Sequence, residues 1–306
     1  MNPQRIIPNI WCDRNAEEAG AFYASVFENA SSAVESRYPE DGLPDFQREF
    51  AGQVLTVALT ISGTRFTLIN AGSEFRPNPS ISFMLNFDPL AFDNSEELAR
   101  GSLDRIWGRL SDAGSALMPL GEYPFSRHYG WVQDRYGVNW QLMLTSPEGE
   151  PRPFVIPALM FDGPAQDRAA EASDFYASLF ADSPGGAEIG HRFPYAEPTG
   201  KAATGALAFG EFRVGDQWFM VADNGSGTDF GFSCGVSLEV SCVDQGEIDR
   251  LWAALSSVPE AEACGWCADR YGVSWQVVPE NIGELMERPG AYQRLLGMKK
   301  LVIDQF

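Results

Sequence analysis

The chain has 306 residues, of which 44% are hydrophobic and 21% charged, a composition typical of a soluble globular protein large enough for two domains. Aspartate and glutamate number 42 against 22 lysines and arginines, which gives a formal charge of −20. Such an acidic surface disfavours nucleic acid and anionic membranes as partners, and no stretch approaches the ~20 apolar residues of a membrane span.

The cysteines and the N-terminal segment bear on the cellular compartment. The five cysteines are an odd number and lack the spacing of a disulfide framework. Residues 1–13 contain Pro8 and Asp13 and lack the apolar core and cleavage site of a signal peptide. We therefore expect a cytoplasmic protein with reduced cysteines.

In chain order, the first half alternates strand and helix signals. An apolar run at 6–12 is typical of a strand, and Asn15 followed by Glu18 resembles a capping box that opens a helix. Apolar residues at helical spacing predict a second helix over 103–110, and a strand pair follows it. Further strands are predicted at 36–39, 54–61, 66–70 and 81–87.

A repeated segment closes each half of the chain. Residues 134–141, Asp-Arg-Tyr-Gly-Val-Asn-Trp-Gln, return at 269–276 with a single difference, Asn139 against Ser274. Each copy reads as a turn that feeds a strand, because its glycine tolerates positive φ and a β-prone run follows. The preceding elements also have counterparts in the second half, at 155–161, 167–180, 207–214, 218–223, 236–242 and 248–255.

The repeat predicts an α+β fold with two tandem domains, 1–147 and 154–280, joined by a linker near 147–153. Each domain reads as two β-α-β-β-β modules. An open module leaves sheet edges uncovered, so we expect paired modules to curl as a mixed sheet around a cleft. Residues 281–306 predict a helical tail and, at 301–304, a closing strand or extended arm. This tail is expected to pack across the domains or onto a second subunit, which makes a homodimer one option.

These motifs resemble the vicinal oxygen chelate (glyoxalase/bleomycin-resistance) superfamily, and within it the PhnB-like group that carries a 3-demethylubiquinone-9 3-methyltransferase domain name. The resemblance rests on Phe-Tyr-x-Ser-x-Phe (22–27), Asp-Arg-x-Trp (104–107), their second copies, and Gly-Trp-x-x-Asp-Arg-Tyr-Gly-Val-x-Trp-Gln. It implies tandem domains with a cleft in each. Methyl transfer is not expected, because no glycine-rich loop for S-adenosylmethionine follows an early strand.

The resemblance also implies where ligands bind. Superfamily enzymes hold a divalent metal with His, Gln and Glu on the strands, and a conspicuous Glu on the last strand corresponds here to Gln141 and Gln276. Uncharged glutamines bind metal weakly, so we expect no metal and no cofactor, and a role in hydrogen-bonding a ligand. The fifth strands offer Ser82 in one half, and Ser237 and Glu239 in the other. The first strands offer Asn9 and Trp11, then Ala158 and Met160.

Aromatic residues complete the predicted ligand-binding sites. Trp131 and Trp266 lie on strands whose alternate residues face the cleft, and Phe75 and Phe230 lie in glycine-rich loops near its rim. His128 is a candidate general acid or base at the first cleft, with a surface histidine as the alternative. Cys264 and Cys267 suggest a redox pair, but residues three apart on a strand point to opposite faces.

We therefore expect a metal-independent small-molecule binding protein. The alternatives are a metal-dependent lyase, isomerase or dioxygenase-like enzyme of the same superfamily, acting through His128 or a weak site around Gln141 or Glu239, and a dimerisation scaffold. The expected partner is a small-molecule ligand, with neither nucleic acid nor membrane.

Overall fold

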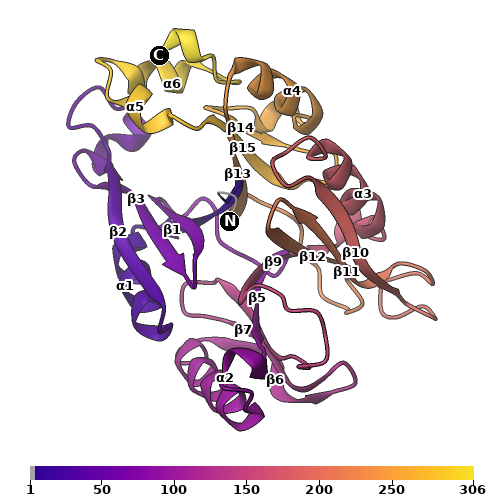
Figure 1. Cartoon of the computed structure of the whole chain (residues 1–306). Helices are drawn as coiled ribbons and strands as arrows, with labels where there is room; N and C mark the ends of the chain where they lie inside the picture. Colours follow the sequence, from indigo (N-terminus) through magenta and orange to yellow (C-terminus); the bar gives the residue numbers. More distant parts are fainter. Residues whose placement is uncertain (1–3) are drawn as a thin grey trace.

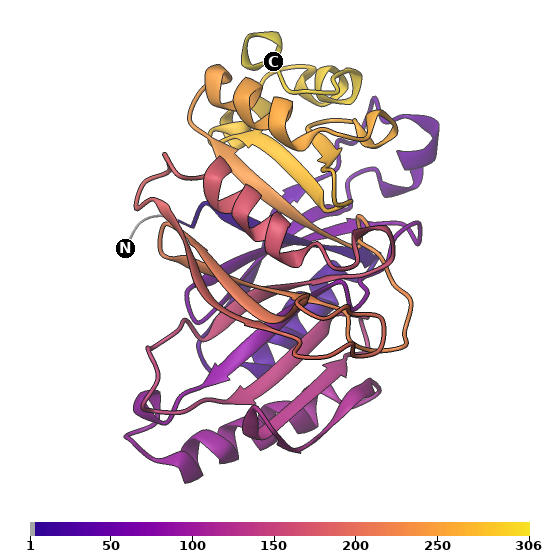
Figure 2. The same cartoon turned by 90° about the vertical axis from the view of Figure 1, so that its right-hand side faces the viewer.

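The computed structural model describes residues 4–306 and has an α+β fold, as predicted (Figures 1 and 2). Its described strands form two mixed sheets, here named sheet A and sheet B. Sheet A has seven strands in the order β14-β15-β13-β1-β4-β3-β2, and sheet B has eight in the order β10-β11-β12-β9-β5-β8-β7-β6. No helix among these residues is long and apolar enough to cross a membrane.

The strands and helices group into four modules and a tail. Module I contains β1 (Ile6–Asp13), α1 (Ala16–Val26), β2 (Ala30–Arg37), η1 (Asp45–Phe50), β3 (Val54–Ile61) and β4 (Thr64–Ala71). Module II contains β5 (Ile81–Phe87), η2 (Pro89–Ala91), α2 (Glu96–Leu110), β6 (Ser115–Tyr123), β7 (Ser126–Gln133) and β8 (Asn139–Leu144). Module III contains β9 (Val155–Phe161), η3 (Gly163–Ala165), α3 (Ala169–Leu179), β10 (Ala187–Pro194), β11 (Leu207–Val214) and β12 (Gln217–Asp223). Module IV contains β13 (Val236–Cys242), α4 (Gln245–Leu255), η4 (Pro259–Ala261), β14 (Trp266–Ala268) and β15 (Ser274–Pro279), and the tail contains α5 (Ile282–Met286), α6 (Ala291–Gly297) and η5 (Ile303–Gln305).

Each sheet joins one module from each half of the chain. Modules I and IV form sheet A, where β1 runs antiparallel to β13, and modules II and III form sheet B, where β5 runs antiparallel to β9. The repeat led us to expect pairing within each half, so this crosswise pairing is a correction. The four modules present equivalent edge strands, and either pairing covers them equally well.

The helical sides of the modules hold each half together. Tyr23 on α1 of module I donates to Asp134 of module II (2.7 Å), and so does the indole of Trp140 (2.8 Å). Tyr176 and Trp275 donate to Asp269 in the same way, at 2.6 and 2.9 Å. Each carboxylate also accepts two backbone N–H groups of its own turn. The two modules of one half therefore contact each other through their helical sides, and modules of different halves pair through their strands.

The strand β4 and its counterpart β12 supply the caps of the first helices. Asn15 occupies the N-cap position of α1, but its side chain makes no cap hydrogen bond. Instead, Asn70 on β4 accepts from the N–H of Ala16 (3.2 Å), and Asp223 on β12 accepts from Ala169 (3.0 Å) at the start of α3. The predicted capping box is therefore wrong, because an oxygen on a neighbouring strand already takes the first helical N–H.

The second half differs from the first near its end. The long β6–β7 hairpin has no full counterpart, since the short connection after α4 contains only η4 and leads to the three-residue β14. Of the strand or extended arm predicted at 301–304, no strand forms, and residues 303–305 make a 3-10 turn. The tail joins the two halves, as expected: Cys264 and Gly265 donate to carbonyls of 298–299, and Tyr292 packs with Tyr38, Leu43 and Phe50 of module I (Figure 1).

Candidate ligand-binding site

The helices cover one side of each sheet, and the opposite side is called here its inner face. On sheet A, α1 packs against β3 and α4 against β15; on sheet B, α2 packs against β8 and α3 against β11. Side chains alternate along each strand, so Ile10 and Trp275 enter the helix-side core while their neighbours project to the inner face. Strand register then aligns Thr67, Asn9 and Ser237 across sheet A, and Glu239, Gln276 and Trp266 in the next row.

The inner face of sheet A carries polar groups that retain hydrogen-bonding capacity. Asn9 donates from Nδ2 to Glu239 Oε2 (3.2 Å), and Gln276 donates from Nε2 to Ser237 Oγ (3.0 Å). Within residues 4–306, neither Glu239 Oε1 nor Gln276 Oε1 has a hydrogen-bond donor. Both atoms can therefore accept a hydrogen bond from a ligand.

Aromatic rings form a corner beside these polar groups. The ring of Trp11 lies 5.0 Å from Phe75 and 6.3 Å from Trp266, with interplanar angles of 86° and 74°. Trp11 is fixed by its indole N–H, which donates to the carbonyl of Gly72 (2.7 Å). Two strands separate β1 from β14, so the two indoles meet over the inner face. Phe75 is 39% exposed, which places an apolar wall within reach of solvent.

Burial sets the electrostatic state of Glu239. It raises the pKa of the carboxyl, and the amide of Asn9 and the more distant Arg65 only partly offset this effect. Arg65 also pairs with Glu35 on β2. Glu239 has no ion-pair partner in the described chain, so its ionised form is stabilised mainly by one neutral amide.

The inner face of sheet B has the same plan with other residues. Its Gln141 is saturated, because Nε2 donates to Ser82 Oγ (2.8 Å) and Oε1 accepts from the Tyr129 hydroxyl (2.7 Å). In the second half, Cys264 stands just before β14 where the repeat places Tyr129, which leaves Gln276 Oε1 without that donor. The positions of Asn9, Trp11 and Glu239 are occupied here by three apolar residues, Ala158, Met160 and Met84.

Most of the apolar residues on this second face form one cluster. Met84, Ile156, Ala158, Met220 and Ala222 are buried together, with Met143, Met160, Phe209 and Trp218 packed against them. Trp131 projects beside Gln141, and its indole nitrogen is buried without a partner among the described residues. Predicted residues Ser82, Gln141 and Trp131 therefore share one face, and Ser237, Glu239, Gln276, Trp266 and Phe75 share the other.

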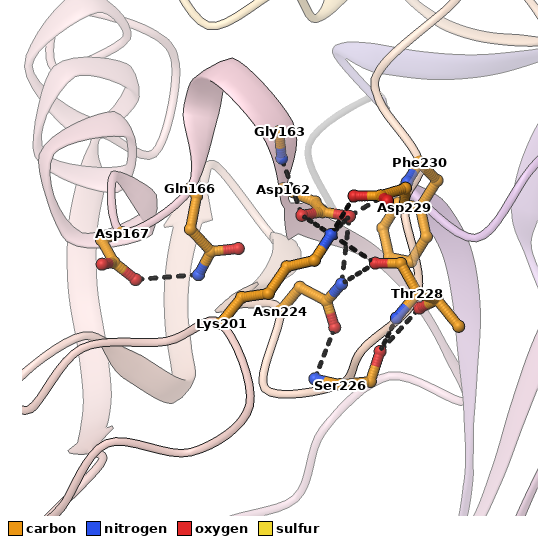
Figure 3. Close-up of polar contacts among 10 residues, drawn as sticks. All are labelled: Asp162, Gly163, Gln166, Asp167, Lys201, Asn224, Ser226, Thr228, Asp229 and Phe230. Carbon is orange, nitrogen blue, oxygen red and sulfur yellow. Dashed lines mark hydrogen bonds and ion pairs between the residues drawn. The ribbon is translucent and has the colours of Figure 1, made fainter.

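Phe230 lies in a loop held by a charged cluster rather than by the sheet (Figure 3). Its backbone N–H donates to Asp162 (3.0 Å), which also accepts from Gly163, Asn224 and Lys201. Burial acts to raise the pKa of Asp162, but these donors outweigh it and leave the pKa below its usual value. Lys201 bridges Asp162 to Asp229, so the cluster fastens two loops together.

Of the chemical candidates from the sequence, His128 and Cys267 lie on the helix sides of the sheets. His128 Nε2 contacts Asp104 on α2 (2.5 Å). Gly130, two residues further along β7 and therefore on the same side of the strand as His128, lies against Trp107 of α2. The imidazole therefore lies on the helix side of β7. Cys264 and Cys267 are free thiols, and burial raises the pKa of Cys267 to about 12, which disfavours a reactive thiolate.

Asn9 and Trp11 contribute more to the site than their place in the sequence prediction suggested. Their strand pattern placed them at the cleft, but neither was included among the ligand-binding residues. The available signal was the contrast between the halves, because Asn9 and Trp11 replace Ala158 and Met160 at equivalent positions of an otherwise similar strand.

The donor set of sheet A does not fit the three-ligand divalent metal site of superfamily enzymes. The amides of Asn9 and Gln276 have one carboxylate beside them, Glu239, since Glu35 is taken up by its ion pair with Arg65. Throughout residues 4–306, no three His, Cys, Asp or Glu side chains converge on one point. A surface hollow of about 550 Å³ lies between residues 122–127 and 144–148.

The two mixed sheets of paired β-α-β-β-β modules match the tandem vicinal oxygen chelate (glyoxalase-like) fold that the sequence predicted. The chain belongs to the family described as 3-demethylubiquinone-9 3-methyltransferase, whose model matches residues 4–143 and again 153–278. No protein of curated function matches the chain.

Solved structures show similarity at two levels. A putative 3-demethylubiquinone-9 3-methyltransferase, the PhnB protein from Bacillus cereus, is 33% identical over 46% of this chain and 100% of its own, with a TM-score of 0.38. Glyoxalase I from Zea mays aligns over 96% of this chain and 97% of its own at 9% identity, with a TM-score of 0.49. A putative dioxygenase from Bacillus subtilis aligns over 88% of this chain and 82% of its own at 13% identity, with a TM-score of 0.43.

Proposed function

We propose that this chain is a small-molecule binding protein that works without a bound metal and takes its ligand on the inner face of sheet A. The observation that carries the proposal is the pair of acceptor atoms, Glu239 Oε1 and Gln276 Oε1, beside the Trp11–Phe75–Trp266 corner. A few polar groups within aromatic walls are the usual composition of a ligand site.

The contrast with sheet B supports this choice of face. There, the equivalent glutamine has both ends paired, and methionines occupy the space around it. A ligand on sheet B must displace a hydrogen bond before it gains one, whereas a ligand on sheet A meets acceptors that have no donor.

A thermal-shift screen of the full chain against a small-molecule library tests the proposal. A ligand at 100 times its dissociation constant stabilises the fold by about 2.7 kcal/mol. We expect the shift to be lost in Trp266→Leu and kept in the matched variant Trp131→Leu on sheet B. The opposite pattern would contradict the proposal. So would stoichiometric divalent metal in the purified protein that disappears in Glu239→Gln, since that result supports the metal-dependent enzyme.

A further inference from the structure

We propose that the ligand of the sheet A face is an organic cation of the ammonium class, held by the Trp11–Phe75–Trp266 corner and the Glu239 carboxylate. This inference rests on the proposed function and adds the chemical class of the ligand. It follows from the charges, the ring geometry and the free atoms of this face.

The charge on this face favours a cation. Glu239 lies in the same cross-strand row as Ile7, Gln276 and Trp266. Arg65 and Glu35 lie near enough to act on its charge. Arg65 is already paired with Glu35, so the two carboxylates outnumber the single cationic side chain. The formal charge of −20 on the whole chain also attracts cations to the surface.

The aromatic rings of this corner meet edge to face and are not stacked. Phe75 and Trp266 both meet Trp11 at steep angles, 86° and 74°, so ring faces are turned in different directions around one corner. A quaternary or protonated amine binds ring faces through their negative quadrupole, and tryptophan is the strongest of the three aromatic types. Such corners accept a compact alkylammonium group that has apolar surface and positive charge together.

Two acceptor atoms of this face have no donor among the described residues. They are Glu239 Oε1 and Gln276 Oε1, while both N–H groups of the Asn9 amide are used within the face, on the carbonyl of Ile7 and on Glu239. Trp11 likewise spends its N–H on Gly72. Beside the rings, the unpaired carboxylate oxygen of Glu239 suits a cationic ligand and disfavours a carboxylate or phosphate.

The other face of the protein provides an internal comparison. Met84, Met160 and Ala158 replace Glu239, Trp11 and Asn9 there, so sheet B lacks the carboxylate and one aromatic wall. Variants at the sheet B positions serve as controls, because they leave the proposed site on sheet A unchanged. Met84→Leu is the matched control for Glu239→Gln, because the two residues hold equivalent places on β13 and β5.

Calorimetric titration of the full chain with choline and with its neutral isostere 3,3-dimethylbutan-1-ol is the direct test. We expect choline to bind at least tenfold more tightly than the isostere. Glu239→Gln and Trp11→Leu should each weaken choline binding at least tenfold, while Met84→Leu leaves it within twofold. Equal affinity for the two probes, no detectable choline binding, or choline binding that is unchanged in Glu239→Gln would overturn the inference.

The library screen separates this inference from the proposed function. If the thermal shift given by a library compound is lost in Trp266→Leu but kept in Glu239→Gln, the cation inference fails and the binding function stands. If no compound gives a thermal shift that is lost in Trp266→Leu, and choline does not bind, the proposed function and the cation inference both fail.

Discussion

Two buried aspartates, Asp134 and Asp269, show what the repeated segment does at the scale of single residues. Each is at most 4% exposed and accepts four hydrogen bonds, two from backbone N–H groups and one each from a tyrosine and a tryptophan. Burial raises the pKa of both carboxyls even so. The segment therefore recurs in the two halves as a structural fastening, and its last residue, a glutamine, projects to the inner face.

The change Asp134→Asn tests this fastening. An amide has one oxygen, so two of the four donors will face an NH₂ group in either orientation. We expect a loss of about 3 kcal/mol in the free energy of unfolding, since buried donors left unpaired cost about 1–3 kcal/mol each. Urea denaturation measures the loss, with the exposed Asp41→Asn as a control that should stay within about 0.5 kcal/mol. A loss below 1 kcal/mol would show that the fastening is dispensable.

The pH dependence of choline binding provides a second prediction at this scale. The free protein holds Glu239 with a raised pKa, whereas a bound cation favours the ionised carboxylate. Affinity should therefore rise with pH through that raised pKa and level off above it. Arg65 on β4 and Glu35 on β2 are the charged groups that face Glu239. Calorimetry across pH measures the slope, and the Glu239→Gln variant should lose it; a slope that persists in this variant would assign the titration to another group.

At the scale of elements, the sequence predicted most strands and helices because their apolar periods are strong. It failed where a second element decides the outcome. The cap of α1 comes from Asn70, which lies 54 residues away, and no local pattern reveals that bond. Module pairing was equally hidden, since β5 and β13 have similar apolar patterns and either is able to extend β1. The short β14 and the 3-10 turn at 303–305 depend on neighbours in the same way.

The inner faces divide into a predictable and an unpredictable part. Strand alternation was enough to bring Gln276, Ser237, Glu239 and Trp266 to one face. Hydrogen-bond saturation was not predictable, because it depends on whether the position equivalent to Tyr129 carries a hydroxyl that reaches the glutamine, and Cys264 does not. The corner made by Trp11 with Trp266 required the crosswise pairing, which alone places β1 and β14 in one sheet.

The tail yields a prediction at the same scale. Tyr292 on α6 is 8% exposed, packs with Tyr38 and Phe50, and donates to Gln47 (2.9 Å). We expect Tyr292→Ala to cost about 3 kcal/mol, as for other large-to-small changes in a core. Hydrogen exchange should increase together in 38–50 and 291–297. Tyr292→Phe, which removes only the hydroxyl, should cost about 1 kcal/mol; faster exchange confined to 291–297 would mean that the tail does not brace module I.

The whole molecule depends on both sheets being shared between the halves. Either half alone exposes the partner-facing edges of β1 and β5, or of β9 and β13, and these edges are apolar. A chain cut between Glu148 and Gly149 should therefore stay assembled. Size-exclusion chromatography after cleavage at an inserted protease site there should give one peak of unchanged volume, and each half expressed alone should aggregate. Separation of the cleaved halves under native conditions would contradict the shared-sheet arrangement.

Joining the halves in one chain also has a consequence for how the two inner faces change. In an assembly of two identical chains, symmetry would impose every substitution on both faces at once. Here β1 and β9 are encoded separately, so one face carries Asn9 and Trp11 while its twin carries Ala158 and Met160. A single molecule is thereby free to hold two unlike surfaces on one symmetrical frame.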